Sequence, residues 1–136
     1  MNVVLDANIL VSAFLAPHGE DARVLRQAQT QNLYLSPFIL SEVHRTLHYP
    51  RIRKKYRYSD AAIQRHVKDL ARISMLIHPQ RTLANVCRDL DDNAVLACAV
   101  EANADYLVTR NVKHFPKTYE EVKIIHPRQF LAMIEK

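Results

Sequence analysis

The chain has 136 residues, of which 49% are hydrophobic, 24% are charged and a single one, Gly19, is glycine. This composition is typical of one soluble globular domain, and one glycine excludes the phosphate loops, dinucleotide fingerprints and nucleophile elbows that need several. The net charge of +5 is concentrated between His44 and Tyr58, where there is no acidic residue, and the rest of the chain is close to neutral. A basic segment on a near-neutral body indicates a polyanionic partner.

The spacing of apolar residues predicts alternating strands and helices. In chain order, the predicted elements are a strand at 3–5, helices at 7–15 and 20–31, a strand at 33–35, a helix from Pro37 that Pro50 stops, the basic stretch at 51–58, a long helix capped by Ser59, a third strand at 75–77, a loop at 78–91, a helix at 92–103, strands at 106–108 and 122–125, and a closing helix from Pro127. This alternation predicts an α/β fold with a parallel sheet, helices on both faces and one domain spanning residues 1–136.

Two cysteines, Cys87 and Cys98, are too few for a disulfide scaffold, and the amino-terminal apolar run is interrupted by Asp6 and Asn8. No stretch approaches the roughly 20 apolar residues that a membrane-spanning helix needs. We therefore expect a cytoplasmic protein in a reducing compartment, with no signal peptide and no membrane contact.

Polar residues follow two of the predicted strands. Asp6 and Asn8 come after the first strand, and Thr109, Arg110 and Asn111 come after the strand at 106–108. Ligands of open parallel sheets bind at the carboxyl ends of the strands, so these residues are candidates for a site. The plainer interpretation of a lone Asp at a strand–helix junction is a helix N-cap.

Two further candidate acids lie in helices. Glu42 borders the apolar stripe of its helix, although a simple ion pair with Arg45 also explains it. Asp92 shares the inward face of the next helix, with Asp89 and Asp91 just before it. Capping and the helix dipole explain one acid at a helix start but not three, because crowded carboxylates repel one another unless a cation offsets them.

Asp6, Glu42 and Asp92 come from three separate elements. If the sheet brings them together, they form an oxygen-only cluster of the kind that binds Mg²⁺ or Mn²⁺. A divalent cation so held can activate water and stabilise a leaving alkoxide, which is the chemistry of phosphodiester hydrolysis.

The basic segment interleaves tyrosines with its charges. Its cations are expected to contact phosphates while aromatic rings stack on unpaired bases, although a solvated face joining two helices is another interpretation. The residues expected to bind RNA are Arg45, Arg51, Arg53, Lys54, Lys55, Arg57 and Arg110.

Taken together, the run Val3–Asn8, the pair Ser41-Glu42 and the run from Arg88 to Phe115 resemble the PIN-domain family of metal-dependent ribonucleases, most of all toxin components of the VapC type. The resemblance covers nearly the whole chain. It implies a sheet of about four or five parallel strands, a cluster of acids holding Mg²⁺ or Mn²⁺, and cleavage of single-stranded RNA. It also implies a homodimer and a cognate antitoxin as partners, so a surface for an inhibitory antitoxin is a third interpretation of the basic segment.

By position, the resemblance makes Asp6, Glu42 and Asp92 the three acids, with Asp91 able to share or replace the role of Asp92. It implies that four polar residues support them: Asn8, Ser12, Thr109 and Asn111. Many members of the family carry an acid at the position of Asn111, and a neutral amide adds no charge there. This departure argues for one cation rather than two, and it motivates the alternative of a non-catalytic RNA-binding protein that retains the fold.

Overall fold

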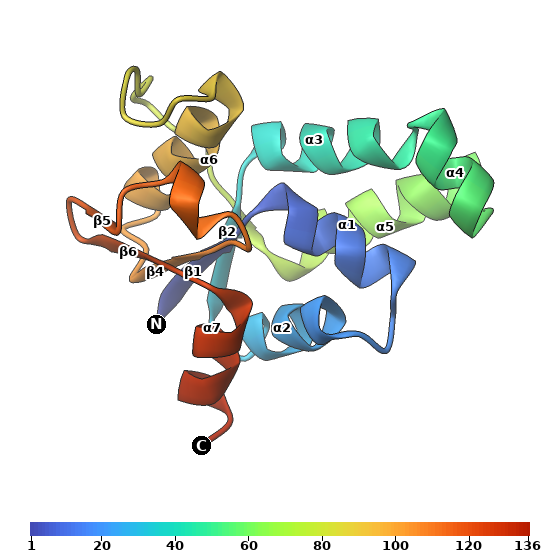
Figure 1. Cartoon of the computed structure of the whole chain (residues 1–136), viewed down its shortest axis with the longest axis horizontal. Coiled ribbons are helices and arrows are strands. Elements are labelled where there is room, and N and C mark those ends of the chain that lie inside the picture. The colour runs from blue at the N-terminus through green and yellow to red at the C-terminus, as the bar shows by residue number, and fades with distance from the viewer.

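The computed structural model describes residues 1–136, which form a six-stranded sheet with helices on both faces (Figure 1). The strands are β1 (Asn2–Leu5), β2 (Asn32–Leu35), β3 (Met75–Leu76), β4 (Tyr106–Val108), β5 (Thr118–Tyr119) and β6 (Val122–Ile125). The helices are α1 (Ala7–Leu15), α2 (Glu20–Ala28), α3 (Pro37–Leu47), α4 (Pro50–Tyr56), α5 (Asp60–Ile73), α6 (Leu90–Glu101) and α7 (Pro127–Ile134), with a 3₁₀ turn η1 (Val112–His114). The predicted α/β class with a mainly parallel sheet is therefore confirmed.

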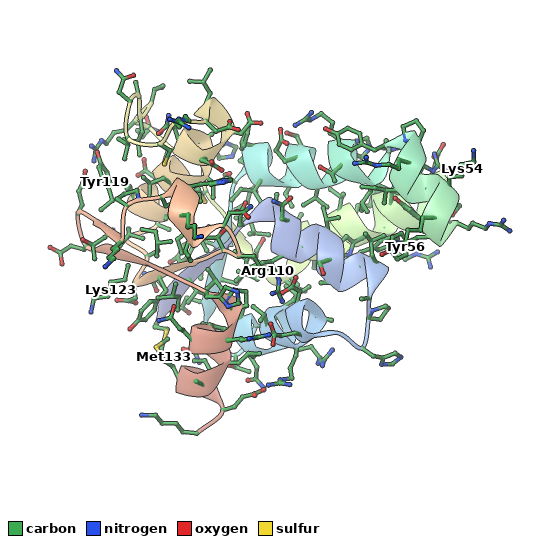
Figure 2. All side chains as sticks on the ribbon, in the orientation of Figure 1. Lys54, Tyr56, Arg110, Tyr119, Lys123 and Met133 are labelled. Carbon is green, nitrogen blue, oxygen red and sulfur yellow. The ribbon has the colours of Figure 1, made fainter.

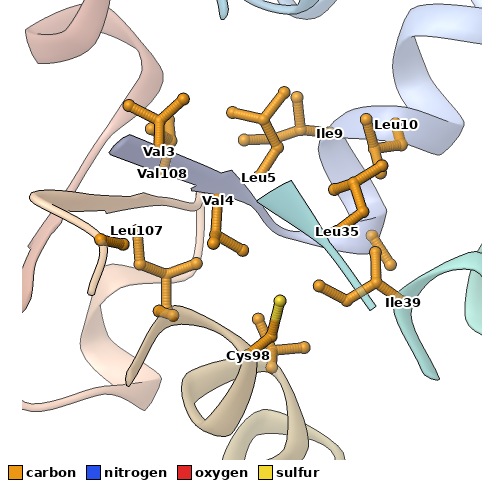
Figure 3. Close-up of a cluster of buried hydrophobic side chains, with 14 of the residues drawn as sticks. Val3, Val4, Leu5, Ile9, Leu10, Leu35, Ile39, Cys98, Leu107 and Val108 are labelled. Carbon is orange, nitrogen blue, oxygen red and sulfur yellow. The ribbon is translucent and has the colours of Figure 1, made fainter. Parts of the chain in front are cut away.

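Strand β1 forms the centre of the core. Val3, Val4 and Leu5 are completely buried, as expected of a parallel strand covered on both faces. Figure 3 shows Val4 on the side of Cys98 in α6 and Leu5 on the side of Ile9 in α1. Because successive side chains of a strand point to opposite faces, three apolar residues in a row anchor helices on both sides of the sheet.

The strand order is β3-β2-β1-β4-β6-β5, and all pairs are parallel except β5 with β6. The chain moves outward from β1 to β2 and β3, then returns to place β4 on the other side of β1. The order thus reverses between β1 and β4, and the crevice at the carboxyl ends of these two strands is where ligands of open α/β sheets bind. Asp6 follows β1 and Thr109 follows β4, so both residues lie at this point.

The sheet has one strand more than the four or five expected. The additional strand, β5, pairs with β6 as an antiparallel hairpin whose turn contains Glu120 at φ 52°. This left-handed conformation is usually adopted by Gly or Asn, so the sequence carries no hairpin signal here. An ion pair between Glu120 and Arg81, 2.9 Å long, helps to hold the turn.

Two boundaries also differ from expectation. The basic stretch contains a short helix, α4, because Pro50 occupies its first turn, where a missing N–H costs nothing. Helix α6 begins two residues earlier than expected, since Asp89 is its N-cap and accepts a hydrogen bond from the Asp91 N–H at 2.8 Å. None of the helices has the length and apolar character required to cross a membrane.

Candidate functional site

A cavity of about 350 Å³ lies at the carboxyl edge of the sheet, between α3 and the start of α6. Its wall consists of Asp6, Ala7, Asn8, Phe38, Glu42, Arg45, Thr46, Tyr49, Asp89, Asp91, Asp92, Val95, Asn111 and His114. The structure therefore brings all four acids expected from the sequence, together with two of the four supporting residues, to one cavity, which we call the acidic pocket.

Asp6 is fixed at the bottom of the acidic pocket. Its main-chain N–H donates to the Val108 carbonyl at 3.0 Å, and its carboxylate accepts a 2.7 Å hydrogen bond from the Thr109 hydroxyl. That hydroxyl in turn accepts from the Asn111 N–H at 3.0 Å. Asp6 occupies the N-cap position of α1 without making a capping hydrogen bond. Burial raises the pKa of Asp6, and the bond from Thr109 partly opposes the rise.

Asp92 is the acid of α6 that faces inward. Its side chain is 17% exposed, whereas that of Asp91 is 55% exposed. Burial, followed by repulsion from Asp6 and Asp89, raises the pKa of Asp92 to about 6. The His114 ring, 3.7 Å from the Asp92 carboxylate, counteracts part of this rise. A carboxyl group destabilised in its ionised form by its neighbours is one that a cation would stabilise.

Glu42 reaches the pocket from α3 and is engaged by a cation of its own helix. It pairs with Arg45, whose guanidinium also lies 3.8 Å from the Asp91 carboxylate and donates to the Tyr49 hydroxyl at 2.8 Å. The Glu42–Arg45 ion pair expected from the sequence is therefore present, and both residues line the acidic pocket. The positive charge of Arg45 offsets the repulsion between the nearby carboxylates of Glu42 and Asp91.

The donor chemistry of the pocket fits a hard divalent cation, because carboxylate oxygens dominate its polar wall. In the present side-chain positions, however, no three His, Cys, Asp or Glu side chains are arranged closely enough to hold a metal ion. Glu42 is paired with Arg45 through one carboxylate oxygen, and Asp6 is bound by Thr109. The residue types and their location fit a hard divalent cation.

Three residues expected near the acids are not part of the pocket wall: Thr109, which is buried behind Asp6, Ser12 and Arg110. Ser12 sits a helical turn beyond Asn8 and does not contribute to the wall. Arg110 binds the buried carboxylate of Asp21 at 2.7–3.0 Å and Glu20 at 2.7 Å, bracing the end of β4 against the start of α2. These bonds raise the pKa of the guanidinium above its usual value and leave Arg110 a structural cation.

The basic residues of α4 lie at the far end of α3 from the acids. Figure 2 shows Lys54 and Tyr56 at the outer end of the molecule, while Arg110 lies near its centre. Of the basic residues, Arg53 is tied to Asp60 at 2.5 Å and to the Tyr58 carbonyl at 3.1 Å. The others on this segment are exposed: Arg51, Lys54, Lys55 and Arg57.

One face of α3 connects these two regions. Phe38, Glu42, Arg45, Thr46 and Tyr49 recur at helical spacing and all line the acidic pocket. Tyr49 is the N-cap of α4, so the wall of the pocket leads directly to the basic helix. A linear polyanion lying along this face would contact both.

Asp89 and His114 also line the pocket. From the sequence, His114 could be either a supporting site residue or a loop-packing histidine beside Phe115. Asp89 lies two residues before the Asp91-Asp92 pair, so carboxylate crowding was its available signal. His114 lies in a 3₁₀ turn three residues after Asn111, where no pattern predicts which way the ring points.

Comparison with known proteins agrees with this arrangement. Residues 2–113 match the family model of the PIN domain. The chain belongs to the PIN-domain family. It is 30% identical to the uncharacterized protein MJ1680 of Methanocaldococcus jannaschii, over the whole of this chain and 93% of that protein. The crystal structure of VapBC2 from Rickettsia felis bound to a DNA fragment from their promoter contains a chain with the same fold, with a TM-score of 0.64 at 16% identity, covering 93% of this chain and 98% of that one.

This match to the family model confirms the resemblance to the PIN-domain family that the sequence motifs indicate. PIN domains are generally nucleases and typically use divalent metal ions, so a hydrolase acting on nucleic acid is the activity that the family supports. The likeness to the Rickettsia felis chain confirms the fold.

Proposed function

We propose that this protein is a Mg²⁺- or Mn²⁺-dependent endoribonuclease that cleaves single-stranded RNA and serves as the toxin of a toxin–antitoxin pair. The observation that carries the proposal is the convergence of Asp6, Glu42, Asp91 and Asp92, from three separate elements, on one pocket at the switch point of the sheet. Asp6, Glu42 and Asp92 would hold the cation, with Asp91 at the outer lip. When bound, the cation would supply Lewis acidity toward the phosphodiester and lower the pKa of a water molecule.

The protein's own residues prepare this chemistry. Thr109 fixes the orientation of the Asp6 carboxylate and opposes part of the rise in its pKa that burial causes, and the Asn111 N–H fixes the Thr109 hydroxyl. Asn8 and Asn111 add neutral donors and acceptors at the edge of the pocket. His114, beside Asp92, is placed to donate a proton or a hydrogen bond to a phosphate oxygen.

The RNA strand would lie along α3 toward α4. Arg45 is near enough to the acids to pass from Glu42 to a phosphate of the substrate, and Tyr49, which is 41% exposed, offers an aromatic ring. Beyond it, Arg51, Lys54, Lys55 and Arg57 would contact phosphates farther along the strand. The same exposed surface is where a cognate antitoxin would compete, and a homodimer in the cytoplasm is part of this proposal.

The decisive experiment measures cleavage of an unstructured RNA by the full chain with Mn²⁺, with EDTA, and in the Asp6→Asn variant. We expect cleavage with Mn²⁺ alone, and its loss in EDTA and in Asp6→Asn. Asp69→Asn, which changes a partly exposed acid on α5 that lies outside the pocket, is the matched control and should retain full activity. Equal cleavage by Asp6→Asn and the wild type would contradict the proposal.

A second variant tests the RNA path. Replacing Lys54 and Lys55 with Gln should weaken RNA binding and reduce the dependence of log K on log salt by about one per lost phosphate contact, with little change in the cleavage rate at saturating RNA. An unchanged salt dependence would remove α4 from the interface.

One observation favours the second candidate, a non-catalytic RNA-binding protein. Arg45 already neutralises Glu42, and the acids are not gathered around a common point. That candidate predicts RNA binding that is equal with Mn²⁺ and with EDTA, and no cleavage under either condition.

A further inference from the structure

A second and larger cavity, of about 670 Å³, adjoins the acidic pocket on the side away from α3. The two cavities share Asp89, Asp92 and His114, so the side chain of Asp92 stands in the wall between them. We call the second cavity the side pocket. Its volume lies within the range of small-molecule binding sites, roughly 300–1,000 Å³.

The cationic residues of the side pocket are not engaged elsewhere. Arg88, from the loop before α6, and Lys113, from η1, are both exposed and belong to none of the molecule's ion pairs. The two acids of the lining, Asp89 and Asp92, stand on the rim that the side pocket shares with the acidic pocket. Away from that rim, the side pocket presents two unpaired cations, Arg88 and Lys113, to an entering ligand.

The remaining wall is apolar and firmly held. Val86, Phe115 and Pro116 line it, and the Phe115 side chain is buried. The adjacent main chain of Cys87 is clamped by the buried Asn93 side chain, which accepts from the Cys87 N–H at 2.7 Å and donates to its carbonyl at 3.2 Å. A fixed apolar wall facing two cations suits a ligand with a flat apolar part and an anionic group, which is the chemistry of a nucleotide.

We propose that the side pocket is a nucleotide subsite, which holds one nucleotide of the substrate strand next to the bond that lies at the acidic pocket. Its base rests on the Val86 and Phe115 wall, and its phosphate contacts Lys113 and Arg88. The shared wall at Asp92 places the linkage between this nucleotide and the next beside the acids. This inference rests on the proposed nuclease function for its role, but nucleotide binding itself requires neither a metal nor catalysis.

The test therefore measures binding without turnover. Adenosine 5′-monophosphate is titrated into the metal-free full chain in EDTA, and its binding is followed by amide NMR shifts. We expect shifts at Val86, Arg88, Lys113 and Phe115, and weaker binding of ribose 5-phosphate, which lacks the base. Lys113→Ala should weaken both ligands by about tenfold, the effect of losing one charge-assisted phosphate contact.

Lys117→Ala is the matched control, because Lys117 is an exposed lysine four residues away that does not line the side pocket and should bind as the wild type does. Shifts spread over α4, or equal affinity of Lys113→Ala and the wild type, would overturn the subsite. If the RNA is cleaved with Mn²⁺ and Lys113→Ala leaves the KM unchanged, the subsite fails while the nuclease proposal stands. If the nucleotide binds in the side pocket but no RNA is cleaved, the nuclease proposal fails and the subsite stands.

Discussion

Replacing Asp92 with Asn should stabilise the metal-free protein. The fold holds the Asp92 carboxylate against the charges of Asp6 and Asp89, which together with burial raises its pKa from 3.8 to about 6. A shift of about two pKa units corresponds to roughly 3 kcal/mol between the two protonation states. Two effects reduce this value: the Asp92 side chain keeps some contact with solvent, and the amide loses about 0.3–1 kcal/mol of interaction with the helix dipole. We therefore expect Asp92→Asn to raise the free energy of unfolding by about 1–2 kcal/mol at neutral pH.

The difference in stability between Asp92→Asn and the wild type should depend on pH. A carboxyl group with a higher pKa in the folded than in the unfolded state binds more protons in the fold between about pH 4 and 6. The unfavourable contribution of Asp92 therefore grows as the pH rises through this window and is complete above it. The advantage of Asp92→Asn should be largest near pH 7.5 and about half as large near pH 5.

Urea unfolding in EDTA, followed by circular dichroism at both pH values, measures this difference. Asp91→Asn is the matched control, because it removes a carboxylate from the same helix turn at a position that is 55% exposed. That variant should be neutral or slightly less stable than the wild type. If Asp92→Asn is no more stable than the wild type near pH 7.5, or gains equally at both pH values, then the acids do not repel one another as described.

Three further perturbations test separate parts of the structure. Thr109→Val removes the hydrogen bond that orients Asp6, so Mn²⁺ affinity measured by calorimetry should fall by about tenfold or more while the chain stays folded; unchanged affinity would deny Thr109 this role. Arg110→Gln leaves the buried Asp21 carboxylate without its guanidinium partner and should lower the free energy of unfolding in urea by about 1–2 kcal/mol. This loss is smaller than for a fully buried pair because Arg110 is partly exposed. The affinity for RNA in filter binding should not change. Burial lowers the pKa of His66, whose Nε2 lies 3.0 Å from the Leu10 carbonyl. Its contribution to stability is therefore present above the ordinary histidine pKa of about 6.5 and is lost as the pH falls below it. The His66→Gln variant should lose stability less steeply than the wild type on acidification, and equal slopes would contradict a contribution from His66.

The sequence predicted the fold well where one physical signal dominates. Strands buried on both faces, such as β1 and β4, need continuous apolar runs, and such runs are visible in a single sequence. The hairpin of β5 and β6 was missed because Glu120 adopts a left-handed conformation without the glycine or asparagine that normally reveals one. Helix α4 was missed because Pro50 was interpreted only as the end of α3, while a proline begins a helix as readily as it stops one.

The candidate site was predictable in its residues but not in its contacts. Asp6, Glu42 and Asp92 follow from which element each begins or borders, and the sheet order then places them together. Apolar spacing placed Asp92 on the inward face of its helix, while the resemblance left Asp91 able to share or replace its role. The structure places Asp92 inward, at 17% side-chain exposure, and Asp91 outward, at 55%. The same limitation applied to the cations, since nothing local distinguishes a basic residue that faces solvent from one bound to an acid distant in sequence.

Arg45 makes one contact that sequence spacing predicts and others that only the fold creates. Its position three residues after Glu42 predicts an ion pair on the helix surface, which usually has little effect on stability. The fold adds Asp91, 3.8 Å from the same guanidinium nitrogen that pairs with Glu42, and the Tyr49 hydroxyl on another nitrogen. The Arg45 side chain therefore lies between the acids and the path toward α4. On the proposed function, a cation bound in the acidic pocket would compete with Arg45 for Glu42, and a released guanidinium would then be free for a phosphate. Metal binding and RNA binding would therefore favour each other through one side chain.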